Sequence, residues 1–114
     1  MQAFHMPYQP LGKVVASRQL DFVRQSGATE VAVVSLGEPV RPDESGPWLC
    51  PYQVCAPSFE RTFAIAGEDS MQALILALHV ISSELISLQR QHGGEFKQYG
   101  EASLGFPHAD NVPR

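Results

Sequence analysis

The sequence contains few basic residues, and they do not cluster. Eight Lys and Arg residues stand against twelve Asp and Glu residues, which gives a net charge of -4. Proteins that bind bulk DNA or RNA carry a concentrated positive surface, so this composition argues against a nucleic-acid partner. Glycine-rich phosphate loops are also missing, because Gly67 stands alone before the longest predicted helix.

Export and membrane segments are a second absence. Residues 1–7 lack the basic start and the apolar run of a signal peptide. No later stretch reads as the roughly 18 to 20 uninterrupted apolar residues that span a bilayer. We therefore expect a soluble, cytoplasmic protein without a membrane partner.

Cysteine is scarce, with Cys50 and Cys55 alone in the chain. A reducing compartment favours free thiols over a disulfide. Residues five apart on a regular strand point to opposite faces, so the two sulfurs should diverge unless a bulge at Pro51 brings them together. We expect no metal and no cofactor, with Cys50 packed as a small apolar core residue.

The length of 114 residues suits one domain with its own core, so we predict a single α+β domain over residues 1–114. Residues 1–12 are interrupted by two prolines and a glycine, which predicts an extended arm lying against its own domain or a partner subunit. Residues 100–114 read as a polar tail.

Period-two alternation and β-branched residues predict four strands, at residues 14–24, 29–36, 48–55 and 59–65, with a short fifth strand near 96–99. The first two should form a hairpin. Because proline lacks an amide hydrogen, Pro51 predicts that its strand lies at a sheet edge or contains a bulge.

The strongest local pattern covers residues 68–91, which contain no Gly or Pro. It predicts a helix that begins with Asp69 as N-cap and Gln72 returning a hydrogen bond, and that ends at Gly93. The helical spacing predicts one apolar stripe on the sheet, made of Leu74, Leu78, Ile81, Leu85 and Leu88. The fold class is therefore α+β: an antiparallel sheet of about four to five strands covered by one long C-terminal helix.

Four segments carry a family resemblance: RQLDF from Arg18, GEP from Gly37, WLCPY from Trp48 and GEDSMQAL from Gly67. Over roughly residues 14–106 the chain resembles a family of small bacterial proteins known only as a domain of unknown function. The most specific part is the Gly-x-Asp-Ser-x-Gln-Ala-Leu start of the helix. The resemblance implies a bacterial origin and a strand-rich half followed by a helix, and it carries no activity.

Catalytic chemistry finds little support in the sequence. His79 could act as a general base, but helical geometry puts it on one polar stripe with Gln72, Ser83 and Arg90, as expected of a surface group. No nucleophile, base and orienting group can be matched to one another. Whether the chain is an enzyme stays uncertain, with a non-enzymatic role favoured.

The functional hypothesis is a protein-interaction module that acts as a homodimer. Residues 71–81 are apolar almost all round the helix, with Leu76 and Val80 away from the predicted stripe, so a second surface must cover part of them. The alternative is a small-molecule-binding protein or minor enzyme, with a pocket between sheet and helix lined by Trp48, Tyr52 and Phe63.

If a binding site exists, we expect it at the start of the helix. Free backbone amides and the positive end of the helix dipole would there meet Asp69, Ser70 and Gln72, with Tyr52 or Trp48 from the neighbouring strand. The structural alternative is that Asp69 and Gln72 only cap the helix.

Overall fold

The structure is a computed structural model that describes residues 5–6 and 11–107. Its elements follow in the order β1 (His5–Met6), β2 (Val14–Arg24), β3 (Thr29–Gly37), β4 (Trp48–Ala56), β5 (Phe59–Gly67), α1 (Ser70–His92) and β6 (Gly94–Lys97). Most of the predicted N-terminal arm (1–4 and 7–10) and the end of the predicted tail (108–114) lie outside the described residues.

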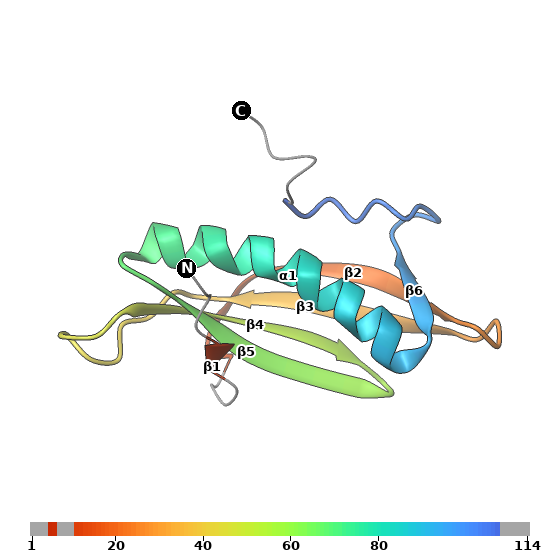
Figure 1. Cartoon of the computed structure of the whole chain (residues 1–114), viewed down its shortest axis with the longest axis horizontal. Coiled ribbons are helices and arrows are strands. Elements are labelled where there is room, and N and C mark those ends of the chain that lie inside the picture. The colour runs from red at the N-terminus through yellow and green to blue at the C-terminus, as the bar shows by residue number, and fades with distance from the viewer. Residues whose placement is uncertain (1–4, 7–10, 108–114) are drawn as a thin grey trace.

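The six strands form one antiparallel sheet in the order β1-β5-β4-β3-β2-β6. Strands β2 to β5 are consecutive neighbours, and α1 then crosses the sheet so that β6 pairs with β2 on the side away from β5 (Figure 1). An antiparallel sheet covered by one long helix is therefore confirmed. The four long predicted strands and the predicted hairpin of β2 with β3 are present.

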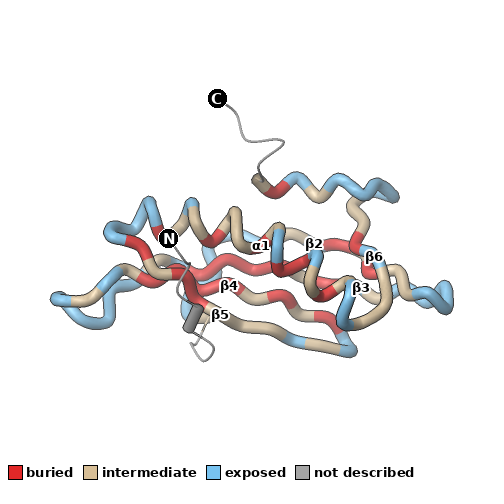
Figure 2. Tube along the Cα trace, viewed as in Figure 1, coloured by how far each residue is buried: buried red, intermediate tan, exposed pale blue. Residues whose placement is uncertain are grey.

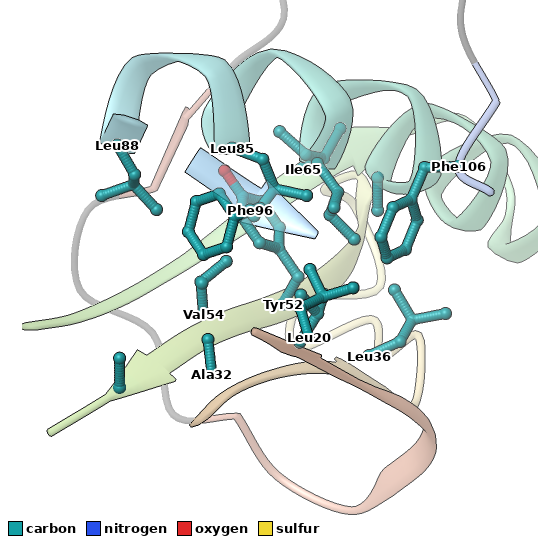
Figure 3. Close-up of a cluster of buried hydrophobic side chains, with 14 of the residues drawn as sticks. Leu20, Ala32, Leu36, Tyr52, Val54, Ile65, Leu85, Leu88, Phe96 and Phe106 are labelled. Atoms are coloured by element: carbon teal, nitrogen blue, oxygen red, sulfur yellow. The ribbon is translucent and has the colours of Figure 1, made fainter. Parts of the chain in front are cut away.

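The core lies between α1 and one face of the sheet. On β4, Cys50, Tyr52 and Val54 face the helix and are fully buried, whereas Gln53 and Cys55 on the opposite face are partly exposed. Figure 3 shows side chains from the strands, α1 and the chain after β6 meeting in this layer. Strand alternation thus sends alternate β4 residues into the core, as period-two patterning predicts.

Helix α1 contacts the sheet through a different line of residues from the predicted one. In its second half the buried residues include three that were predicted: Ile81, Leu85 and Leu88. In its first half Ala73 and Ala77 are fully buried, while Leu74 and Leu78 are only half-buried. The predicted stripe is wrong there because small side chains bring the helix axis close to the sheet and leucines occupy the flanks.

Gly67 makes this close approach possible. A Cβ atom at Gly67 would lie 2.4 Å from the backbone nitrogen of Ala73, so β5 and the first turn of α1 meet where no side chain fits. The trace coloured by exposure shows the sheet side of α1 buried and its outward side exposed (Figure 2).

Strand β4 lies between β3 and β5, so of the two alternatives predicted at Pro51, an edge strand or a bulge, the edge strand is wrong. The pairing of β4 with β3 runs from Cys55 to Tyr52 and stops one residue before Pro51. On the other side Pro51 pairs in register with Ala64 of β5. The missing amide hydrogen therefore costs no β3–β4 hydrogen bond.

Strand β1 pairs with β5, His5 opposite Ile65 and Met6 opposite Ala64. At these two residues the predicted arm lies against its own chain. Among the described residues, the ladder between β1 and β5 consists of these two pairs.

After β6 the chain turns and covers part of the core. Gln98 and Glu101 exchange two backbone hydrogen bonds of 2.9 Å around a tight turn whose first central residue, Tyr99, has a φ of 53°. The chain then runs beside α1 as the C-terminal segment (residues 102–107), where the Ser82 hydroxyl donates to the carbonyl of Pro107. Phe106 is buried in the core, so this part of the predicted polar tail is a structural element.

Candidate functional site

Asp69 caps the start of α1 as predicted, but the return hydrogen bond of Gln72 goes to Glu68 and not to Asp69. The Asp69 carboxylate accepts a 2.7 Å hydrogen bond from the backbone N–H of Gln72. The Gln72 side-chain oxygen in turn accepts a 2.7 Å bond from the backbone N–H of Glu68. Ser70, the first helical residue, is exposed. These bonds satisfy two backbone donors at this end, which accounts for Asp69 and Gln72 structurally.

The two aromatic residues predicted beside the helix start lie at different places along β4. Trp48 pairs with Gly67, next to the first turn of α1. Tyr52 lies four residues further on, about 13 Å along the strand, and its hydroxyl is close enough to Glu84 for that carboxylate to affect its pKa. The structure therefore brings Trp48, and not the Tyr52 hydroxyl, near the helix start. A binding role for these residues stays a prediction.

A polar centre that the sequence analysis missed lies beneath the second half of α1. Arg61 of β5 and Glu84 of α1 form an ion pair with 3.4 Å between Nε and Oε1, and the Glu84 side chain is 9% exposed. Burial, and then the nearby Glu84 carboxylate, raise the pKa of Tyr52. In Figure 3 the Tyr52 hydroxyl points toward α1.

Three buried atoms of this centre have no hydrogen-bond partner among the described residues: Tyr52 Oη, Arg61 Nε and Glu84 Oε1. Buried polar atoms are normally hydrogen-bonded, and here Arg61 Nε and Glu84 Oε1 compensate each other only through their 3.4 Å ion pair. Its sequence signal is a carboxylate, Glu84, placed within the apolar spacing of Ile81, Leu85 and Leu88.

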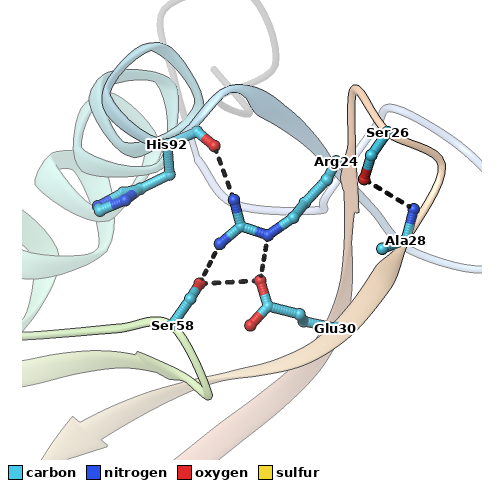
Figure 4. A network of polar contacts seen from close by, with 6 residues as sticks. All are labelled: Arg24, Ser26, Ala28, Glu30, Ser58 and His92. Carbon is cyan, nitrogen blue, oxygen red and sulfur yellow. Dashed lines mark hydrogen bonds and ion pairs between the residues drawn. The ribbon is translucent and has the colours of Figure 1, made fainter.

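A second polar network joins three elements at the end of α1 (Figure 4). The Arg24 guanidinium pairs with Glu30 across 2.8 Å, donates to the carbonyl of His92 and donates to the hydroxyl of Ser58. Ser58 in turn donates a 2.8 Å hydrogen bond to Glu30. The hydrogen bond from Ser58, followed by Arg24, holds the pKa of Glu30 below its ordinary value. A cation at the last carbonyls of a helix complements its dipole, so this network anchors α1.

Two grooves flank the C-terminal segment. The helix-side groove, of about 540 Å³, separates the segment from α1 and is lined by Ser82, Ser83, Leu85, Ile86, Gln89 and residues 102–106. The strand-side groove, of about 340 Å³, is lined by Ala16, Ser17, Arg18, Val34, Leu36, Leu78, Ile81 and residues 105–107. Both are open to the surface, and the predicted pocket residues Trp48, Tyr52 and Phe63 line neither of them.

Exposed apolar residues follow the outward side of α1. Met71 is 70% exposed, Ile86 50% and Ile75 46%. Leu78 and Ser82 are half-buried between them, and the steps of three or four residues put all five on one side of the helix. We name this set, Met71, Ile75, Leu78, Ser82 and Ile86, the outer stripe. The sequence analysis had counted Leu78 among the sheet contacts and did not identify the set.

By length and composition α1 could cross a membrane, so the expectation that no segment approaches such a span is wrong for this helix. The core helix of a soluble protein passes the same test when it is mostly buried. Only 33% of the most apolar 18-residue window of α1 is buried. The most exposed apolar residues of the helix are those of the outer stripe, Met71, Ile75 and Ile86.

The cysteines are free and differ in burial. Cys50 lies in the core, where burial raises its pKa to about 11, and Cys55 lies on the open face, where partial burial and Glu60 raise its pKa. They are therefore on opposite faces of β4, as predicted. Within residues 5–6 and 11–107, no group of three or more His, Cys, Asp or Glu side chains is placed to hold a metal ion.

Comparison with known proteins gives one match. A family model described as Domain of unknown function (DUF6968) matches residues 16–108, more than half of the chain. No curated protein and no solved structure matches the chain.

Proposed function

We propose that this chain, which belongs to the DUF6968 family of unknown function, is a non-enzymatic protein-interaction module that acts as a homodimer. The observation that carries the proposal is the outer stripe of α1. Its three most exposed members are large apolar side chains spaced along about four turns of one helix. Contiguous apolar surface of this kind is typical of contact sites.

The charge distribution favours a protein partner over lipid or nucleic acid. Helices that lie on membranes carry Lys and Arg on their polar face, and those that bind nucleic acid present a basic surface. Glu68 and Asp69 precede α1, and Arg90 is its only basic residue apart from histidines. The free thiols fit a reducing compartment, so we extend the proposal to a bacterial cytoplasm, as the family resemblance implies.

Analytical ultracentrifugation over a wide concentration range tests the proposal. We expect the mass of two chains at micromolar concentration and dissociation on dilution. A single-chain mass throughout the range would remove the main support for the interaction-module role.

The strand-side groove favours a second candidate function, the binding of a small molecule between sheet and helix. Most of the side chains that line it are apolar, among them Val34, Leu36 and Ile81, and its volume of about 340 Å³ lies in the range of ligand pockets. Mass spectrometry before and after denaturation tests this candidate. A stoichiometric small molecule released from the purified protein would support it, and a clean apo mass from several expression hosts would count against it.

A further inference from the structure

We propose that two copies of this chain pair α1 against α1 in antiparallel orientation, with the Met71 side chain of each copy in the helix-side groove of the other. The inference rests on the proposed homodimer and adds its geometry. Met71 and Ile86 stand at opposite ends of the outer stripe, 15 residues apart, about 22 Å along the helix axis. A two-fold axis near Leu78 and His79 therefore places Met71 of one copy beside Ile86 of its partner. The symmetry repeats this contact at the other end of the helix pair.

The two ends of the stripe are complementary in shape. Met71 projects from the first turn of α1 with 70% of its surface exposed, and its flexible thioether chain adapts to irregular cavities. At the other end Ile86 borders the helix-side groove, whose far wall is the C-terminal segment. A reversed second copy places a projecting Met71 beside a groove at both ends of the contact.

The middle of the stripe pairs a large side chain with a small one. The same axis places Ile75 of one copy opposite Ser82 of the other, beside the hydrogen bond that joins Ser82 to Pro107, and this pair also occurs twice. In this arrangement Ile75 packs against Ser82 and against the C-terminal segment that borders it. Leu78 faces His79 beside the axis, so each layer of the contact holds at least one apolar side chain.

The charges at the two ends of α1 fit the antiparallel orientation. Glu68 and Asp69 precede the helix, and Arg90 lies in its last turn, all of them exposed. No ion pair joins Glu68 or Arg90 to another residue in the described part of the chain. Reversing the second helix puts the acidic start of each beside the basic end of the other, whereas parallel pairing would put like charges together.

Disulfide trapping tests the register. In a Cys55→Ser background, the double variant Met71→Cys with Ile86→Cys should form a covalent dimer under mild oxidation. Each single variant should not, because the two copies of residue 71 lie about 22 Å apart in this arrangement and a disulfide needs Cα atoms within about 7 Å. The same distance prevents a bond between residues 71 and 86 of one chain. A dimer band from Met71→Cys alone would overturn the antiparallel register.

A charged substitution in the middle of the stripe gives the energetic test. Ile75→Lys should raise the dimer dissociation constant at least about thirtyfold, as expected for a central interface residue. Val31→Lys is the matched control, since Val31 is 49% exposed on the open face of the sheet and should change the constant less than about threefold. Circular dichroism checks that both variants fold.

The outcomes separate the two proposals. A single-chain mass for the wild type would reject both. A wild-type dimer that survives Ile75→Lys and gives no 71–86 cross-link would reject this interface and leave the homodimer. Binding of wild-type protein to zwitterionic vesicles, lost in Ile75→Lys while the dimer persists, would assign the stripe to lipid and overturn the inference.

Discussion

The first half of α1 lies on the sheet through Ala73 and Ala77, whereas the second half does so through Ile81, Leu85 and Leu88. The first half thus leaves its large apolar side chains Met71 and Ile75 outside. The second half places Ile81, Leu85 and Leu88 in the core and leaves only Ile86 of its large apolar side chains outside. The exposed apolar residues on the outward side of α1 lie outside the core, so they add little to the stability of the fold. We therefore assign them to contacts with another chain.

The largest expected effect contrasts a buried leucine of the second half with an exposed residue of the first. Leu88→Ala should lower the free energy of unfolding by about 2 to 5 kcal/mol, because it leaves a cavity under α1. Ile75→Ala should change it by less than about 0.5 kcal/mol in dilute protein. Urea titration of both variants measures the difference, and equal losses would show that both halves contribute alike to the core.

Overpacking the first half sharpens the comparison. Ala77 is fully buried, so Ala77→Leu should destabilise the fold by about 1 to 3 kcal/mol, since the close contact with the sheet leaves no room for a larger side chain. Ser83→Leu, at an exposed position of the second half, is the control and should be nearly neutral. A stable Ala77→Leu variant would mean that the helix can move away from the sheet at low cost.

The beginning of α1 is capped by the side chains of Asp69 and Gln72. Removing one of them should destabilise the fold less than the changes in the core described above. Gln72→Ala should lower the free energy of unfolding by about 0.5 to 2 kcal/mol, with partner affinity unchanged once the protein is folded. Ser70→Ala serves as control because Ser70 is exposed and only precedes the capped turn. Loss of partner binding in Gln72→Ala at an unchanged melting temperature would instead support a binding site at the helix start.

The end of α1 is anchored by the network of Arg24, Glu30 and Ser58. The contribution of this network to the stability of the fold should depend on pH. The pKa of Glu30 is lowered in the fold from an ordinary value of 4.5. The carboxylate therefore stabilises the fold above the unfolded pKa, and this contribution is lost as the pH falls through the folded pKa. Glu30→Gln should lower the melting temperature slightly near pH 7. If the difference in melting temperature between the wild type and Glu30→Gln persisted at pH 2, it would come from packing and not from charge.

The sequence predicted the long elements because their patterns are local. Alternation from Arg18 to Phe22 defined β2, and the stretch without Gly or Pro defined α1. The cap at Asp69 followed from residue type and spacing alone. These features depend on neighbours a few residues away, so one sequence is enough to identify them.

Features that depend on distant partners were missed or misplaced. Pro51 indicated an edge strand or a bulge, yet β4 is an interior strand, whose ladder with β3 stops before the proline. The rotation of α1 depends on how closely Gly67 allows the helix to approach. The centre at Glu84 required Arg61 from β5 and Tyr52 from β4, which a helical pattern does not reveal.

Labelling of the Cys50 thiol can report how often β4 separates from α1. Its side chain is inaccessible to solvent, and with a pKa near 11 only about one thiol in ten thousand is ionised at pH 7. A thiol reagent can reach the reactive form only after β4 separates from α1. The rate at which Cys50 is labelled in native buffer therefore measures how often the layers part, and Cys55 on the open face supplies the reference rate within the same molecule.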